Sequence, residues 1–295
     1  MTLGPFSKVC KNADDLLSKV FPSVGSDGAA QESQTLKVEV KSANGLKNVV
    51  EASRKNQGAI TASVEPSLTC DKCHGSFSAK VKSDSSVDVT ITGNNVAKVD
   101  GLTVEVKAGL GAGVSVTPKV EFANDTVNTS VELAYPLGAE QKDGPKVDAS
   151  LLFAYENFRI GGAATIKIAD VNAAQAQFGA AYVQQDLLAG ASVCWNGESK
   201  KYKVNAVFHH QLADLAADLV VKGSWEPSVG TNVTIGVQHK INESTSTKAK
   251  VNQAGAVGLA LSTKVNSNVS LDLGSQFALG DLNDQKIALG VTLSN

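Results

Sequence analysis

The sequence has no apolar run long enough for a membrane-spanning helix, and it has almost no arginine. A spanning helix must be apolar over about 20 residues, and no such stretch occurs in a chain whose mean hydropathy is −0.04. Among its 27 basic residues only Arg54 and Arg159 are arginine, and the net charge is −2. A helical membrane protein is therefore excluded, and we expect no nucleic-acid partner.

The N-terminal segment also lacks the features of the common targeting peptides. Residues 1–24 contain no uninterrupted apolar core, because lysines and aspartates break the segment repeatedly, so they do not form a secretory signal peptide. They contain two aspartates and no arginine, which excludes an arginine-rich matrix presequence. If the protein enters a membrane, we expect it to reach the outer membrane of an organelle from a cytosolic precursor.

A persistent two-residue periodicity is present instead. Between Leu102 and Leu110 every second residue is apolar, and the segment from Val114 to Phe122 repeats the pattern. Such alternation is typical of a β-strand with one apolar face. The segments are about ten residues long, which is the length that a tilted strand needs to cross a bilayer. The pattern predicts a transmembrane β-barrel.

Nineteen such segments can be placed between turn-forming Gly, Asn, Asp, Ser or Pro residues. They lie near 34–42, 46–54, 57–65, 75–83, 86–93, 100–110, 112–122, 126–135, 145–155, 158–168, 175–184, 187–195, 201–210, 214–225, 229–239, 245–252, 255–264, 268–277 and 285–294. Alternation would also occur in a soluble β-sandwich, whose apolar faces meet in a core. The short connections and the lack of a domain-sized linker favour the membrane barrel, and a soluble β-rich binding protein remains the alternative.

An amphipathic helix is predicted before the first strand. Apolar residues from Phe6 to Val20 recur at spacings of three and four, and Pro22 ends the pattern. The following stretch is rich in Ser, Gly and Ala, which is typical of a flexible connector. We therefore divide the chain into a helix and connector at 1–33 and a barrel at 34–295.

Three motifs resemble the voltage-dependent anion channel family, the mitochondrial porins. The segment from Cys10 to Lys19 is similar to the family's Gly-Lys-Ser-Ala-Arg-Asp helix, and Ala249-Lys250-Val251-Asn252 with the later Val257-Gly258-Leu259 is similar to its Ala-Lys-Val-Asn and Ile-Gly-Leu signature. The last segment, Lys286 to Leu293, resembles the sorting signal of mitochondrial barrels. The resemblance covers nearly the full chain. It implies a 19-stranded barrel whose first and last strands pair in parallel, with the helix in the lumen.

The chain departs from this family at several positions. Asp14 stands where the family has an arginine, Pro22-Ser23-Val24-Gly25 replaces a glycine-rich hinge, and Ala288 replaces the glycine of the sorting signal. The family's lipid-facing glutamate aligns with Ala79, so roles that depend on that carboxylate are not expected. The chain therefore resembles a divergent member of the voltage-dependent anion channel family.

The resemblance implies a voltage-gated, weakly anion-selective channel of the mitochondrial outer membrane that passes ions and small metabolites such as ATP, ADP and phosphate. Its partners would be the lipid bilayer, anionic metabolites and nucleotides in transit, a homo-oligomer and other mitochondrial membrane complexes. The voltage-sensing, pore-lining helix would use Lys8, Lys11, Asp14, Asp15 and Lys19, and Gly25 would be the hinge. Nucleotide contacts would come from Ala256, Val257, Gly258, Gly274, Ser275, Gln276, Phe277 and Ala278.

The lumen is expected to be lined by the polar faces of the strands, which carry several lysines. These lumen-facing residues are Lys37, Lys41, Lys107, Lys119, Lys203, Lys248, Lys250 and Lys264. Carboxylates such as Glu39, Glu105 and Glu121 share the same faces, so a weak selectivity is expected. The related barrel pore of the mitochondrial protein-import machinery is an alternative function.

One motif indicates other chemistry. Cys70-Asp71-Lys72-Cys73-His74 has the spacing of covalent haem attachment, but a turn or a disulfide-forming loop is the favoured interpretation. No catalytic triad or paired carboxylates stand out in the sequence. We expect no cofactor, no metal ion and no enzymatic activity.

Overall fold

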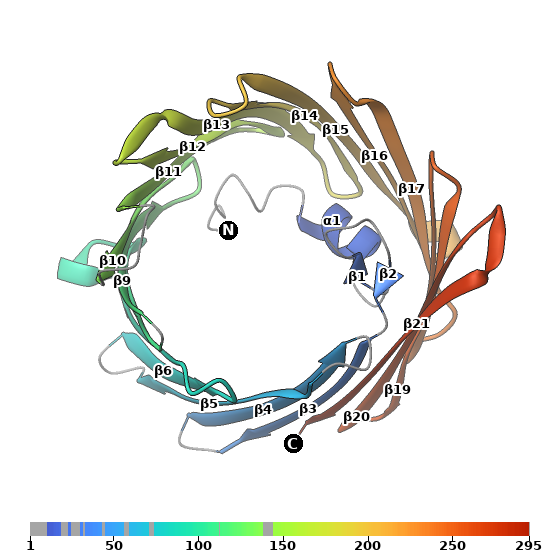
Figure 1. Ribbon diagram of the computed structural model, residues 1–295, viewed down its shortest axis with the longest axis horizontal. Coiled ribbons are helices and arrows are strands. Elements are labelled where there is room, and N and C mark those ends of the chain that lie inside the picture. The colour runs from blue at the N-terminus through green and yellow to red at the C-terminus, as the bar shows by residue number, and fades with distance from the viewer. Residues whose placement is uncertain are drawn as a thin grey trace.

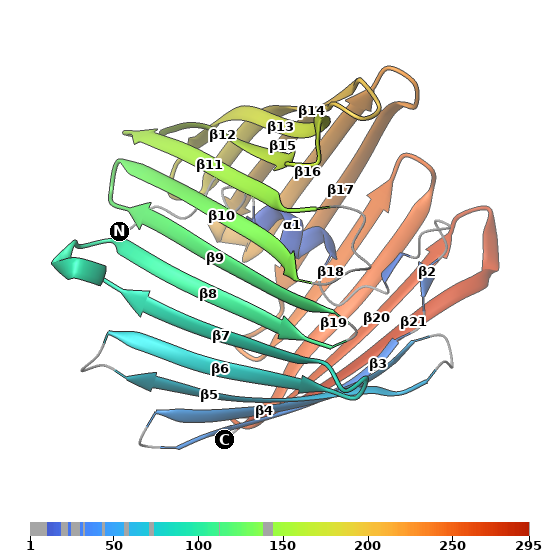
Figure 2. The ribbon, with the colours of Figure 1, turned by 60° about the vertical axis from the view of Figure 1, so that its left-hand side comes forward.

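Nineteen strands of this computed structural model close into a barrel around a short helix (Figure 1). The structure describes residues 11–18, 23–24, 30–31, 33–42, 45–55, 59–70, 74–111, 113–137 and 144–294. The strands cross the barrel wall at a slant, and neighbouring strands are staggered along it (Figure 2). Strand tilt and stagger of this kind are required to close a sheet into a barrel.

The first half of the barrel wall runs from β3 to β12. These strands are β3 Ser33–Lys41, β4 Leu46–Lys55, β5 Thr61–Cys70, β6 Gly75–Lys82, β7 Val87–Asn94, β8 Leu102–Leu110, β9 Val114–Ala123, β10 Val127–Leu137, β11 Lys146–Tyr155 and β12 Phe158–Lys167. A single-turn 3-10 helix, η2 Val96–Lys98, lies between β7 and β8.

The second half of the wall runs from β13 to β21. These strands are β13 Asp170–Val183, β14 Leu187–Asn196, β15 Lys201–Leu212, β16 Ala217–Glu226, β17 Gly230–Lys240, β18 Thr245–Asn252, β19 Ala256–Asn266, β20 Val269–Ala278 and β21 Asp281–Ser294. A second 3-10 helix, η3 Ala213–Leu215, precedes β16. The N-terminal elements are α1 Lys11–Ser18, β1 Ser23–Val24 and β2 Ala30–Gln31.

The barrel closes through one parallel pair of strands. Every other neighbouring pair in the wall is antiparallel, whereas β21 pairs with β3 in parallel, from Ala288 opposite Ser33 to Ser294 opposite Glu39. An odd number of alternating strands leaves one such pair at the closure. The 19-stranded fold with parallel first and last strands is therefore confirmed, and the closed wall leaves no strand edge unpaired.

The contacts of α1 identify which face of the strands points inward. Lys250 on β18 donates to the carbonyl of Leu17, and Gly236 on β17 lies against the Leu16 and Leu17 side chains. Residues opposite each other in the register share a face, so the pairing carries this inward face around the whole ring. The complementary face points outward.

The outward face is apolar and exposed. Ile91, Val131 and Phe178 are 56%, 51% and 64% exposed, and they lie in the middle parts of β7, β10 and β13. A soluble protein rarely leaves so many large apolar side chains uncovered, whereas a bilayer covers them with hydrocarbon. The apolar face therefore meets lipid, and the alternative of a soluble sandwich core is wrong. Within the described part of the chain, no helix is both long enough and apolar enough to span a membrane.

Short turns with specific local chemistry join the strands. The Asn124 side chain accepts hydrogen bonds from the backbone N–H groups of Thr126 and Val127, at 2.9 and 2.7 Å, and this Asx turn joins β9 to β10. Gly101 has φ +82°, and a Cβ there would lie 2.0 Å from the Ala123 carbonyl oxygen. Only glycine fits this position, directly before β8.

The structure differs from the predicted elements at a few places. The predicted flexible connector contains a two-residue ladder, in which β1 pairs with β2. Strand β13 begins at Asp170 and not near 175, with a register shift opposite Thr165 and Lys167. Strand β16 begins at Ala217 because η3 ends in a left-handed residue, Ala216. The described helix is Lys11–Ser18, and the other parts of the predicted helix lie outside the described residues.

A charge placed on the outward face should destabilise the barrel in lipid. Ile91→Lys would put an ammonium group into the hydrocarbon and should lower the free energy of unfolding by about 2–4 kcal/mol. Thr92→Lys is the matched control, since position 92 faces inward opposite Glu105 and should change stability by less than about 0.5 kcal/mol. Urea unfolding in vesicles, followed by tryptophan fluorescence, measures both variants. Equal losses would contradict the assignment of the faces.

Candidate pore

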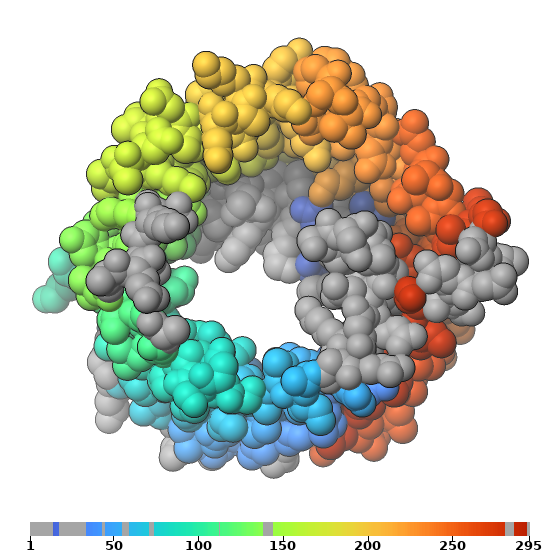
Figure 3. All heavy atoms as spheres, viewed as in Figure 1, coloured from blue at the N-terminus to red at the C-terminus, as the bar shows by residue number. Residues whose placement is uncertain are grey.

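An open lumen passes through the barrel. Figure 3 shows an opening through the molecule when it is viewed along the direction used in Figure 1. A closed sheet of this many strands is too wide for its inward side chains to fill. The inward faces carry Lys, Glu, Asp, Ser, Thr and Gln side chains, so the passage is polar.

Helix α1 is held against the wall by an apolar contact. Leu16 and Leu17 are 5% and 9% exposed, and they pack against Val220 on β16 and Val207 on β15. Gly236 admits the helix, because a Cβ at this position would lie 2.4 Å from the Leu17 Cδ2 atom. Burial of a leucine side chain contributes about 1.5–3 kcal/mol. The two leucines therefore supply most of the docking energy.

Two polar contacts orient the docked helix. Asp14 forms an ion pair with Lys222 on β16, and the Lys250 ammonium group donates to the Leu17 carbonyl oxygen at 3.1 Å. Both side chains of the ion pair are nearly half exposed, so the pair contributes only about 0–1 kcal/mol. Lys250 satisfies a carbonyl at the C-terminal end of the helix, where a cation is favourable.

The structure describes only some of the predicted voltage-sensing residues. Asp14 and Asp15 lie on α1 and are half buried. Lys11 begins the helix, but its side chain is outside the described part of the structure, as are Lys8, Lys19 and the predicted hinge Gly25. Asp14 stands where the voltage-dependent anion channel family has an arginine, and here it pairs with Lys222. The voltage-sensing role of this set remains a prediction.

The wall from β3 to β11 carries charges that pair with one another. Glu39 is surrounded by three lysine ammonium groups at 3.0–3.5 Å. Further pairs join Lys80 to Glu65, Lys82 to Asp88, Lys107 to Glu105, Lys119 to Glu121 and Lys146 to Asp148. Their fields largely cancel at a distance, so this half of the lumen has little net charge.

The wall from β13 to β20 has an excess of lysine. Lys203, Lys240 and Lys264 have no carboxylate partner among the described residues. The inward carboxylates of these strands are Asp170 at the start of β13, Asp218, Glu226 and Asp272. Positive potential is therefore concentrated on the half of the lumen where α1 docks.

All eight lysines of the predicted lumen set lie on the inward face. Lys37, Lys41, Lys107 and Lys119 belong to the paired wall, and Lys203, Lys248, Lys250 and Lys264 belong to the lysine-rich wall. The sequence pattern did not show which of these lysines pair with carboxylates. Their effect on permeation remains a prediction.

The segments predicted to contact nucleotides form neighbouring strands β19 and β20. Gly258 lies opposite Gln276, and Val257 lies opposite Phe277. Gly258, Gly274 and Gln276 share the inward face with Lys250, whereas Val257, Ser275 and Phe277 point outward. Only the inward members of this set can meet a solute in the lumen.

The Cys-x-x-Cys-His motif lies between β5 and β6 in the chain. Cys70 is disulfide-bonded, and its partner lies outside the described residues, so its thiol is not available for a thioether to haem. His74 directly precedes β6 and has a left-handed conformation, with φ 48°. Among the described residues, no group of three or more His, Cys, Asp or Glu side chains could hold a metal ion.

Aromatic side chains mark the two ends of the outward face, and the sequence analysis missed them. Near the β11–β12 turn, Phe158 and Tyr182 contact each other at a ring distance of 5.4 Å. At the opposite end of the barrel, the rings of Tyr202 on β15 and Trp225 on β16 lie 5.6 Å apart. Aromatic girdles of this kind sit at the two membrane interfaces of barrels. The sequence could have predicted these girdles, because its aromatic residues stand close to the ends of the predicted strands.

Filling the space at position 236 should release the helix. Gly236→Val would push Leu17 off the wall, and the amides of residues 11–18 should exchange with deuterium about tenfold faster or more, because one leucine burial is lost. Gly223→Ala on β16 is the control, since a Cβ there meets no atom within 4 Å. Unchanged exchange in Gly236→Val, measured by mass spectrometry, would show that this contact does not hold α1.

Comparison with solved structures shows the porin fold. A mutant of the Rh. blastica porin with three substitutions aligns with a TM-score of 0.50 at 11% identity, covering 82% of this chain and 90% of that one. A structure described under asymmetric conductivity of engineered proteins aligns with a TM-score of 0.51 at 12% identity, covering 88% and 96%. At these identities the similarity concerns the fold alone.

Comparison of sequences shows the family. The mitochondrial outer membrane protein porin of Candida albicans is 23% identical over 300 residues, which cover 100% of this chain and 99% of that protein. The model of the eukaryotic porin family matches residues 3–290. The chain belongs to the eukaryotic porin family, and it is a barrel channel of the mitochondrial outer membrane, as the sequence motifs predicted.

Proposed function

We propose that this channel is voltage-gated and weakly anion-selective, and that it passes ions and small phosphorylated metabolites such as ATP, ADP and phosphate. The observation that carries the proposal is the unequal distribution of charge in the lumen. Charges on β3–β11 are paired, whereas Lys203, Lys240 and Lys264 on the lysine-rich wall have no carboxylate partner in the described part of the chain. An anion that follows the second wall meets a favourable potential, and a cation does not.

The selectivity should be weak because the passage is wide and polar. Permeating ions keep much of their water in such a lumen, and the wall lysines act on them through screened fields. The lysine excess is also confined to one part of the wall. The resemblance to the voltage-dependent anion channel family agrees with a preference that favours anions without excluding cations.

Voltage gating is supported by the modest strength of helix docking. One elementary charge moved across the membrane contributes about 2.3 kcal/mol per 100 mV. The burial of two leucines and one half-exposed ion pair amounts to only a few kcal/mol. A membrane potential acting on Asp14 and Asp15 can therefore compete with docking.

Reversal potentials in planar bilayers under a salt gradient test the proposal. The triple variant Lys203→Glu, Lys248→Glu, Lys264→Glu should change the sign of the preference from anions to cations, because it reverses the charge of the lysine-rich wall. The matched control removes a complete ion pair, with Lys119→Gln and Glu121→Gln together. Its reversal potential should stay at the wild-type value.

Two results would contradict the proposal. An unchanged reversal potential in the triple variant would show that these lysines do not set ion preference. Flux of unfolded polypeptide through reconstituted channels, without efflux of nucleotides, would favour the alternative of a protein-import pore.

A further inference from the structure

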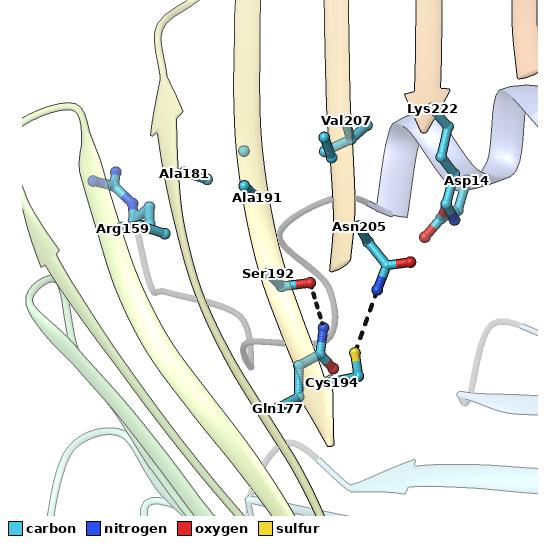
Figure 4. A pocket seen from close by; sticks show the side chains of 13 residues that line it. Asp14, Arg159, Gln177, Ala181, Ala191, Ser192, Cys194, Asn205, Val207 and Lys222 are labelled. Atoms are coloured by element: carbon cyan, nitrogen blue, oxygen red, sulfur yellow. Dashed lines mark hydrogen bonds and ion pairs between the residues drawn. The ribbon is translucent and has the colours of Figure 1, made fainter. Parts of the chain in front are cut away.

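A hollow in the inner wall lies beside the docked helix (Figure 4). It has a volume of about 360 Å³ and extends from Arg159 on β12 to Lys222 on β16, with Asp14 of α1 at its edge. A second hollow of about 380 Å³ adjoins it and shares Gln177 and Cys194 with it. Each volume lies in the range of small-molecule sites, which begins at about 300 Å³.

The hollow exists because the wall here is built from small inward residues. Ala181 and Gly190 face each other across β13 and β14, and Ala163 continues the same face on β12. Most inward positions of β3–β9 carry lysine, glutamate or hydroxyl side chains instead. A solute in the lumen can therefore approach the backbone of β12–β14 more closely than it can elsewhere on the wall.

Two amide side chains are held in place on the floor of this hollow. Gln177 donates through Nε2 to the Ser192 hydroxyl at 3.0 Å, and Asn205 donates through Nδ2 to the Cys194 sulfur at 3.3 Å. Figure 4 shows these four side chains together, below the helix. Both amide oxygens accept no hydrogen bond from the described residues. They can accept from N–H donors, such as the exocyclic amino group of a nucleobase.

A cation, Lys203, lines the second hollow. Lys203 is directly opposite Cys194 in the register of β14 and β15, and its side chain is exposed. It has no carboxylate partner in the described part of the chain, whereas Lys222 at the far side of the hollow is occupied by Asp14. An ammonium group without a partner can bind a phosphate by a charge-assisted hydrogen bond.

We propose that these two adjoining hollows together bind a nucleoside phosphate on its way through the channel. The Gln177 and Asn205 oxygens accept hydrogen bonds from the base, and Lys203 binds the phosphates. The site lies on β12–β16, away from the β19–β20 segments considered above. The inference rests on the proposed function to the extent that nucleotides must enter the lumen.

Cys194 provides a reporter inside the site. It is a free, partly buried cysteine that lines both hollows. Iodoacetamide should alkylate it in reconstituted channels, and peptide mass spectrometry should read its modification separately from that of the other cysteines. Bound ATP should slow alkylation by a factor of 1 + [L]/Kd, which is about fivefold at four times the Kd.

Variants and ligands distinguish the parts of the site. Lys203→Gln should abolish the protection by ATP, whereas Lys240→Gln, which removes another inward lysine on β17, should retain it. Tripolyphosphate should protect less than ATP at equal concentration, because it has no base. Equal protection by both ligands would overturn the role of the amides, and no protection by ATP would overturn the site.

The reversal potential of the same channels separates this inference from the proposed function. Anion preference without protection of Cys194 would contradict the binding site alone. Protection of Cys194 in channels that show no anion preference would support the binding site and contradict the proposed selectivity.

Discussion

The need to pair every backbone N–H and C=O group inside the bilayer determines the rest of this structure. Hydrocarbon offers no hydrogen-bond partner, so a sheet can cross a membrane only as a closed barrel. Nineteen strands close here because β21 and β3 pair in parallel, from Ala288 to Ser294 on one strand and Ser33 to Glu39 on the other. Closure then makes one face of every strand lipid-facing and the other water-facing, and the alternation of apolar and polar residues follows from that geometry.

The same closure leaves a wide lumen, and the residues that line its wall are not distributed evenly. Most of the lumen is polar, but Val207, Val220 and Gly236 form an apolar patch that receives the two leucines of α1. The patch lies on the lysine-rich half of the wall, so the helix and the excess positive charge occupy the same half of the passage. Any movement of the helix would therefore change the potential that permeating solutes meet.

Much of the barrel could be predicted from the sequence, because strand alternation and turn residues are local signals. The strand count and the parallel closure were correct, although the closure itself came from the resemblance. The helix-docking site could not be predicted. Asp14 and Lys222 are separated by 208 residues, and Gly236 is an ordinary glycine in an alternating segment. Nor could alternation alone decide which face points outward, since a sandwich core and a lipid-facing barrel produce the same pattern.

The direction of the two faces is the central claim, and spin-label accessibility along β8 tests it most directly. Single nitroxide labels from Thr103 to Gly109, in channels reconstituted into vesicles, would be exposed in turn to oxygen, which concentrates in lipid, and to a water-soluble nickel complex. Labels at Val104, Val106 and Ala108 should favour oxygen, and those at Thr103 and Lys107 should favour nickel, because these side chains alternate between lipid and lumen. Accessibility without a period of two, or with the faces reversed, would contradict the account.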